Sequence, residues 1–387
     1  MPSPFSAGRL ILPALLALLG SLGCVDHNHG TPLYVWDGSS SAVLEWNDVN
    51  NVYTASGGVA PKPDNTITSS GLLGGLTLGW GGMTMNTGNN SLYLVSESGL
   101  VVVIPNVSNQ SGELTGNSTT TNIYSFQLGA AGTDQFSSGS VFGQAGIDTS
   151  TGSLYVMETS KDGTANRVWA VASSLQAPGN TLTPATSYTS SVSGDSLGCG
   201  LAVGTNSNVF GLFGGNNNGI VDPSNTTIYG ARLRLGVGNS FPASSNVIIG
   251  ADTGLNTPSS WSSLAYDVQN SVLYVLPEPN STSTDPAVLR FGYGQFANGF
   301  DQTPNGTLSD TQATLQDTRI LAHPTGSDWL LGADFTLDTS TVFQGTGMSF
   351  IRIWKNPSGG GSMTKVTLAT ASSAAVEVRG MAMGQSN

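Results

Sequence analysis

A repeated two-strand pattern constrains this sequence more than any other feature. In one copy, residues 145–160, small and apolar residues alternate up to Asp148. A Thr, Ser and Gly turn follows, and then a strand of aromatic and β-branched residues. Related copies begin at Met83, Leu201 and Leu264. In all four, nine positions separate the first apolar residue from the first large residue of the second strand. This constant register predicts a fold built from repeated β-hairpins.

The two ends of the chain each carry half of the repeat. Residues 33–36, LYVW, match the second strand without a first strand before it. Residues 379–384, RGMAMG, match the first strand, and their two methionines correspond to Met83 and Met85. This split predicts that the two ends pair in one sheet, which removes the open edges that an unclosed array of sheets would leave.

Six units of about 60 residues can be counted. Their first strands are expected at Met83, Ala145, Leu201, Leu264, a degenerate copy at Phe335, and Met381. Third strands are expected at residues 42–46, 101–105, 167–171, 228–235, 287–294 and 350–354. Fourth strands are expected at residues 65–69, 122–128, 186–192, 246–250, 311–315 and 364–369. Residues 33–387 are therefore predicted to form one all-β domain, a six-bladed β-propeller with four-stranded blades.

Three copies of the repeat carry a resemblance to known propellers. Residues 146–156 (GIDTSTGSLYV), 265–275 (AYDVQNSVLYV) and 86–94 (NTGNNSLYL) each join an apolar strand to an L-Y-V or L-Y-L strand through a turn. The sequence thereby resembles the broad class of YVTN, NHL and SMP-30-like β-propellers over most of residues 33–384. This class includes lactonases, binding scaffolds and ligand sensors, so the resemblance implies a fold and not one activity.

Charge excludes some partners. The chain of 387 residues has 12 basic and 24 acidic residues, a net charge of −12, and no basic cluster. Nucleic-acid binding requires Lys and Arg to neutralise phosphates, so no nucleic-acid partner is expected. A polybasic membrane patch is disfavoured for the same reason.

The N-terminus is typical of an export signal. Arg9 precedes an apolar core at residues 10–19 that is too short to span a bilayer, so residues 1–23 are predicted to be a signal peptide. Cys24 resembles the lipidated cysteine of bacterial lipoproteins, although Ser21 stands where such motifs usually have Leu. Lipid attachment at Cys24, followed by a tether over residues 24–32, is favoured, with ordinary secretion as the alternative. The expected location is the outer membrane, cell surface or periplasm, or the medium if no lipid is attached.

Few residues suggest catalysis. Cys199 lies in a predicted inner strand, where a small buried thiol is the default. His27 and His29 lie in the tether and make an incomplete metal site, and His323 has no Ser/His/Asp arrangement around it. No metal site, cofactor or catalytic residue is therefore assigned.

Acidic residues recur at two places in the repeat. The first strands end at Asp, Asn or Gly, which favours a turn over a cation site; these residues are Asn86, Asp148, Gly204, Asp267, Asp338 and Gly384. Glu97, Glu158 and Glu278 follow the second strands at similar offsets and could line one face. Solvated strand ends are the favoured interpretation of these three glutamates.

Aromatic residues precede three of the first strands. Trp80, Phe142 and Trp261 each lie three residues before the first apolar position, where a propeller chain passes the rim of the central channel. They are candidate ligand-binding residues, with packing between blades as the alternative. Tryptophans in predicted third strands are expected to pack between blades; they are Trp46, Trp169 and Trp354.

Two functions remain. The first is a non-catalytic propeller of the cell envelope or exterior that binds a protein, glycan or assembly subunit through one face. The second is a secreted metal-dependent lactonase-type hydrolase with its site in the central channel. The scaffold needs only the features described above, whereas the hydrolase needs a set of metal ligands that the sequence does not locate, so the scaffold is favoured.

Overall fold

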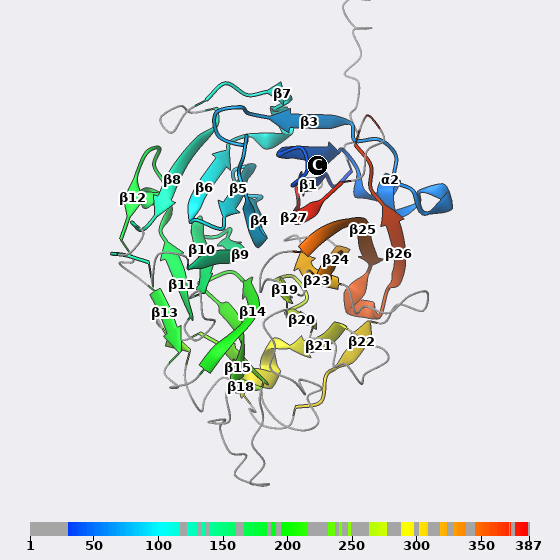
Figure 1. Ribbon diagram of the computed structural model, residues 1–387. Helices are drawn as coiled ribbons and strands as arrows, with labels where there is room; N and C mark the ends of the chain where they lie inside the picture. The colour runs from blue at the N-terminus through cyan, green and yellow to red at the C-terminus, as the bar shows by residue number, and fades with distance from the viewer. Residues whose placement is uncertain are drawn as a thin grey trace, which may run out of the picture.

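The chain folds into six β-sheets arranged around a common centre (Figure 1). The structure is a computed structural model. It describes residues 30–116, 122–130, 133–135, 140–159, 166–183, 187–190, 195–215, 231–236, 240–241, 247–248, 263–276, 288–297, 302–308, 318–322, 329–337, 345–370, 372 and 376–385. Helix within these residues is limited to α2 (Val49–Tyr53) and short 3-10 turns.

Three sheets have five strands each. Sheet 1 contains, in spatial order, β27 (Val378–Met383), β1 (Leu33–Asp37), β2 (Ala42–Trp46), β3 (Asn65–Thr68) and β7 (Gly112–Glu113). Sheet 2 contains β4 (Leu78–Asn86), β5 (Ser91–Ser96), β6 (Leu100–Ile104), β8 (Tyr124–Leu128) and β12 (Thr181–Leu182). Sheet 3 contains β9 (Val141–Asp148), β10 (Ser153–Thr159), β11 (Asn166–Val171), β13 (Ser187–Ser190) and β17 (Ser240–Phe241).

The other three sheets have four strands each among the described residues. Sheet 4 contains β14 (Asp195–Val203), β15 (Val209–Gly215), β16 (Ala231–Leu235) and β18 (Val247–Ile248). Sheet 5 contains β19 (Ser263–Asp267), β20 (Val272–Leu276), β21 (Val288–Gly292) and β22 (Gly306–Leu308). Sheet 6 contains β23 (Thr318–Ala322), β24 (Trp329–Leu337), β25 (Gly345–Lys355) and β26 (Ser362–Thr367).

The two ends of the chain meet in sheet 1. Strand β1 pairs on one side with β2 and on the other with β27, so that Leu33 lies opposite Met383 and Val35 opposite Met381. All pairs among the first four strands of each sheet are antiparallel.

The second strands are buried on both faces, which explains their unbroken apolar sequences. In β1, Leu33 and Val35 pack in the cluster shared with sheet 6, whereas Tyr34 and Trp36 pack in the cluster shared with sheet 2. A strand covered on one side only would alternate apolar and polar residues. The L-Y-V pattern therefore reflects a position between two neighbouring sheets.

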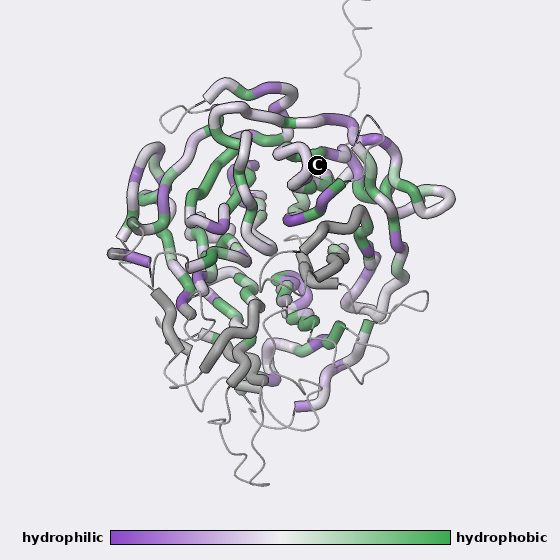
Figure 2. Tube along the Cα trace, viewed as in Figure 1, coloured by the Kyte–Doolittle hydropathy of each residue, from purple (hydrophilic) through white to green (hydrophobic). Residues whose placement is uncertain are grey.

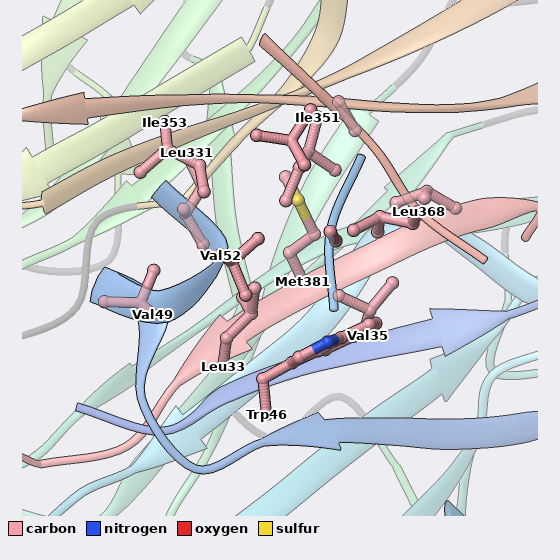
Figure 3. Close-up of a cluster of buried hydrophobic side chains, with 14 of the residues drawn as sticks. Leu33, Val35, Trp46, Val49, Val52, Leu331, Ile351, Ile353, Leu368 and Met381 are labelled. Carbon is pink, nitrogen blue, oxygen red and sulfur yellow. The ribbon is translucent and has the colours of Figure 1, made fainter. Parts of the chain in front are cut away.

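Six hydrophobic clusters join the sheets in sequence. Each contains residues from two neighbouring sheets, in the order 1–2, 2–3, 3–4, 4–5, 5–6 and 6–1. Figure 3 shows the cluster between sheets 6 and 1, where Ile351 and Ile353 of β25 face Leu33 and Val35 of β1. Helix α2 adds Val49 and Val52 to it.

The innermost strands surround the centre. Strands β27, β4, β9, β14, β19 and β23 each contact the next, and β23 also contacts β27. Strands β4 and β9 approach so closely that a Cβ atom at Gly79 would lie 2.1 Å from the Phe142 carbonyl oxygen, so only glycine fits there. Figure 2 shows that apolar residues recur along the strands. The fold is a β-propeller.

Sequence-distant segments extend the outer edges of four sheets. In sheets 1, 2 and 3, the fifth strand pairs in parallel with the fourth. In the sequence, each fifth strand lies between the third and fourth strands of the next sheet. In sheet 6, Val59 forms a parallel bridge with Thr367, and the Ala60 N–H donates to the Thr367 carbonyl at 2.9 Å. These links cover outer edges that would otherwise present unpaired backbone groups.

Three details of the sequence prediction need correction. The strand containing Phe335, β24, is the second strand of sheet 6, because β23 lies inside it. The outermost strand of sheet 5 is β22, whereas residues 311–315 lie outside the described residues. Sheets 1 to 3 have five strands instead of the predicted four, because the fifth strand comes from a neighbour and no local pattern marks it.

Candidate functional site

The two predicted rim aromatics that the structure describes occupy different environments. Trp80 lies near the start of β4 and is half-buried, packing against the cluster between sheets 6 and 1. Phe142 lies at the start of β9 and has no exposed surface, with its ring 6.1 Å from that of Trp169. Phe142 thus packs between sheets 2 and 3 and offers no surface for stacking a ligand. Trp261 lies outside the described residues.

Arg379 of β27 joins Trp80 to two acidic residues. Its guanidinium lies over the Trp80 ring, 5.4 Å from the centroid, which is cation–π geometry. Its Nε donates to Glu377 Oε1 at 2.7 Å, and its Nη1 lies 3.6 Å from Glu97 Oε1. These four residues, Trp80, Glu97, Glu377 and Arg379, are called the Arg379 cluster below.

The cluster is partly open to solvent. The side chains of Arg379, Glu377 and Glu97 are 17%, 26% and 30% exposed. Two carboxylates share one guanidinium, so the three ionised groups carry a net negative charge. Burial raises the pKa of the Glu97 carboxyl above its ordinary value, and Arg379 offsets part of that rise.

Glu97 is held by the turn between β5 and β6. The Ser96 hydroxyl accepts a hydrogen bond from the Leu100 N–H at 2.9 Å, and Gly99 adopts a φ of 82°. The Glu97 N–H donates to the Thr77 carbonyl at 3.0 Å, and its carbonyl accepts from the Phe142 N–H at 3.0 Å. Backbone bonds from two sheets therefore position this carboxylate.

A pocket of about 400 Å³ lies beside the cluster, between the loop of residues 71–77 and the turn of residues 96–100. Leu72, Leu76 and Leu100 provide apolar lining, and Thr77, Ser96 and Ser98 contribute hydroxyl-bearing residues. Glu97 is the one charged residue that lines it among the described residues, and we name the cavity the Glu97 pocket.

The prediction that Glu97, Glu158 and Glu278 are solvated strand ends is wrong for Glu158. Its side chain is fully buried, and Oε2 accepts from Arg167 Nε and Trp169 Nε1, both at 2.7 Å. It is a structural ion pair within sheet 3. Glu278 lies outside the described residues.

Asp148 and Asp267, at the ends of two first strands, are turn residues, as predicted. Asp148 accepts from the Ser150 N–H at 2.9 Å and from the Ser207 N–H of sheet 4 at 2.8 Å. Asp267 accepts from the Asn270 N–H at 2.9 Å. Trp46, Trp169 and Trp354 all pack in clusters between sheets, which confirms that prediction.

Gln144 occupies space between four innermost strands. Its Nε2 donates to Ser263 Oγ of β19, and its Oε1 accepts from the Leu201 N–H of β14. A Cβ atom at Gly81 of β4 would lie 2.8 Å from its Cγ. Nothing in the sequence marked this residue, because its partners are more than fifty residues away along the chain.

Most of the remaining residues singled out in the sequence lie outside the described ranges. Cys24, His27, His29, His323 and Asp338 lie outside the described residues. Cys199 lies in β14, as expected for an inner strand. Within the described ranges, no three His, Cys, Asp or Glu side chains come together as a metal site, and no helix has the length and apolarity to cross a membrane.

Comparisons with known proteins support the fold alone. No protein-family model matches the sequence. No curated protein matches it. A chain from the crystal structure of a nidogen/laminin complex is similar in structure, with a TM-score of 0.50, 8% identity, and coverage of 92% of this chain and 99% of that one. A chain of the mitotic checkpoint complex aligns with a TM-score of 0.37, 12% identity, and coverage of 76% of this chain and 63% of that one. The first likeness places this chain in the broad class of β-propellers.

Proposed function

We propose that this chain is a non-catalytic scaffold that binds a protein partner through the face carrying the Arg379 cluster. The observation that carries the proposal is the gathering of a half-buried tryptophan, an arginine and two carboxylates at one end of the innermost strands, in a chain with few charges. Tryptophan and arginine are the residues most enriched at energetically dominant positions of protein interfaces.

Two further observations support this proposal. The similar propeller chain was solved in a complex of two proteins. Gln144 fills space at the centre of the innermost strands, where a channel hydrolase would place its metal and substrate. We further propose that the six sheets are the blades of one closed ring, because a rigid ring would hold the cluster, drawn from sheets 1 and 2, in a fixed geometry.

Site-directed photo-crosslinking in the native cell tests the scaffold function. A photoreactive residue at the exposed position Ser98 lies on the face of the Arg379 cluster. The control position is the exposed Asn51 in α2. Helix α2 lies at the opposite end of the strands from the Arg379 cluster. It follows Trp46, which pairs with Leu33. Leu33 in turn lies opposite Met383, at the other end of β27 from Arg379.

We expect one discrete protein adduct from position 98, none from position 51, and loss of the adduct in Arg379→Met. Equal crosslinking from both positions would contradict a specific binding face. The absence of any protein adduct from position 98 would contradict the proposal as well.

We also propose that the chain is exported and that Cys24 carries the lipid, so that the propeller is tethered to the cell envelope. The sequence of residues 1–24 supports this proposal. Metabolic labelling with a fatty acid should mark the wild-type chain and not Cys24→Ser. Equal labelling of the two chains, or none in either, would contradict lipid attachment at this residue.

A further inference from the structure

The Glu97 pocket combines one carboxylate with aliphatic walls. Leu72 and Leu100 are partly exposed, pack against the cluster between sheets 1 and 2, and line the cavity with apolar side chains. A ligand that fills the pocket must therefore carry an apolar body and a group that satisfies a carboxylate.

The carboxylate lacks a full counter-charge. Arg379 donates its Nε to Glu377 at 2.7 Å and approaches Glu97 only at 3.6 Å. One guanidinium facing two carboxylates leaves one negative charge uncompensated in the Arg379 cluster. The protein as a whole carries a charge of −12, which attracts cations to such a site. An incoming cation would stabilise the ionised form of Glu97, which burial disfavours.

The pocket suits lysine better than arginine. An arginine binds a carboxylate best through two parallel hydrogen bonds, and Oε1 of Glu97 is the oxygen closest to Arg379. A lysine needs a single oxygen for its compact ammonium, and its four-carbon stem gains from leucine side chains along the wall.

We propose that the Glu97 pocket binds the side chain of a lysine presented by the protein partner. This inference rests on the proposed scaffold function for the source of the lysine. The binding chemistry itself belongs to the pocket, so it can be tested without the partner.

A direct test uses the purified chain and three short peptides, Ac-Gly-Lys-Gly-NH₂ and the same peptide with acetyl-lysine or norleucine in place of lysine. Binding is followed by ligand-observed NMR. We expect the lysine peptide to bind, with about tenfold lower affinity for the other two peptides and a weakening with added NaCl. Equal binding of the norleucine or acetyl-lysine peptide overturns the proposal.

Two variants locate the binding. Glu97→Gln removes the charge, and Ser98→Lys brings a cation to the rim while leaving Glu97 in place. Both should lower affinity for the lysine peptide by about tenfold while the chain remains folded. Undiminished binding in Glu97→Gln overturns the proposal, and undiminished binding in a folded Ser98→Lys does so even if Glu97→Gln fails to fold.

The same variants separate this inference from the proposed function. If the crosslink from position 98 persists in Glu97→Gln but disappears in Arg379→Met, the scaffold function stands and the lysine pocket is wrong. If the lysine peptide binds and no protein crosslinks, the pocket chemistry stands, while the proposed function and the protein source of the lysine are both wrong.

Discussion

Glu97 and Glu158 lie near the ends of equivalent strands in neighbouring sheets, Glu158 within β10 and Glu97 one residue beyond β5, yet their environments differ. Glu158 in sheet 3 is fully buried and bonded at 2.7 Å to both Arg167 and Trp169. Glu97 in sheet 2 is 30% exposed, lines a pocket and lies 3.6 Å from Arg379. Glu158 therefore forms a buried structural ion pair, whereas Glu97 is partly open to solvent.

A difference of one residue separates the two outcomes. Glu158 lies within β10, on the same side as Leu154 and Val156, which pack between sheets 2 and 3. Glu97 lies just beyond the end of β5 at Ser96, in a turn. Because strand side chains alternate between faces, one additional position moves a carboxylate from an interface between sheets to the rim. The offset from the end of the strand therefore decides whether the carboxylate is buried between sheets or lies at the rim.

The largest expected effect comes from removing Arg167, the cation that pairs with the buried Glu158. Arg167→Met should lower the free energy of unfolding by about 3–5 kcal/mol at pH 7, because it leaves the Glu158 carboxylate buried without its ion pair. Urea denaturation measures the loss. The double variant Glu158→Leu, Arg167→Met should recover part of it, since both charges are then gone. A single-variant loss below about 1 kcal/mol would place this pair with ordinary surface pairs.

The next effect concerns the second donor to Glu158. Trp169→Phe keeps a ring beside Phe142 but removes the indole N–H that donates to the carboxylate, and it should cost about 1.5–3 kcal/mol. The matched control is Trp46→Phe, which removes a 2.8 Å bond to the neutral carbonyl of Pro61 and should cost about 0.5–1.5 kcal/mol. Thermal and urea unfolding compare the two variants. An equal loss in both would show that the charge of Glu158 adds nothing to this hydrogen bond.

Removing the cation at the rim should have a smaller effect. Arg379→Met breaks contacts to side chains that are 26–30% exposed, so the free energy of unfolding should fall by less than about 1 kcal/mol. Urea denaturation of the Arg379→Met and Arg167→Met variants compares the two losses of unfolding free energy directly. A loss as large as that of Arg167→Met would show that the Arg379 cluster is structural and would remove the contrast between the two glutamates.

The smallest expected effect is the pH dependence of Glu97. Burial raises its folded-state pKa, so its favourable contribution is complete below the unfolded pKa, about 4.3, and is lost as pH rises through the folded value. Glu97→Gln should therefore gain stability relative to the wild type as pH increases through this window. Urea midpoints from pH 3.5 to 7.5 measure the difference. A constant difference, or one of opposite sign, would show that Arg379 compensates the burial of Glu97 in full.

Much of the fold could be predicted because it depends on patterns among residues that are close together in the sequence. The constant register of the hairpins, the unbroken L-Y-V runs and the split repeat at the two ends predicted the sheets and the pairing partners of β1. The third-strand tryptophans were placed correctly between sheets. Around Phe335 the sequence matches the repeat poorly, and there the prediction assigned a second strand as a first strand.

The site was predicted only in pieces. Trp80 and Glu97 were each noticed, but Arg379, which joins them, was not. Local spacing cannot show that β27, at the end of the chain, contacts β4. The burial of Glu158 was missed because it depends on Arg167 lying opposite on the next strand. The fifth strands were missed because two-residue parallel pairs leave no periodic signal.

Local sequence patterns specify a repeating β-architecture, because alternation, turn chemistry and register are properties of neighbouring residues. Which charged side chains come into contact depends on how the sheets are placed in space. Sheet 1 draws on both ends of the chain and contacts sheet 2, so that Arg379 lies beside Glu97, whereas Glu158 finds its partner within its own sheet. The pairing of β27 with β1 in sheet 1 creates the contacts on which the proposed binding face depends.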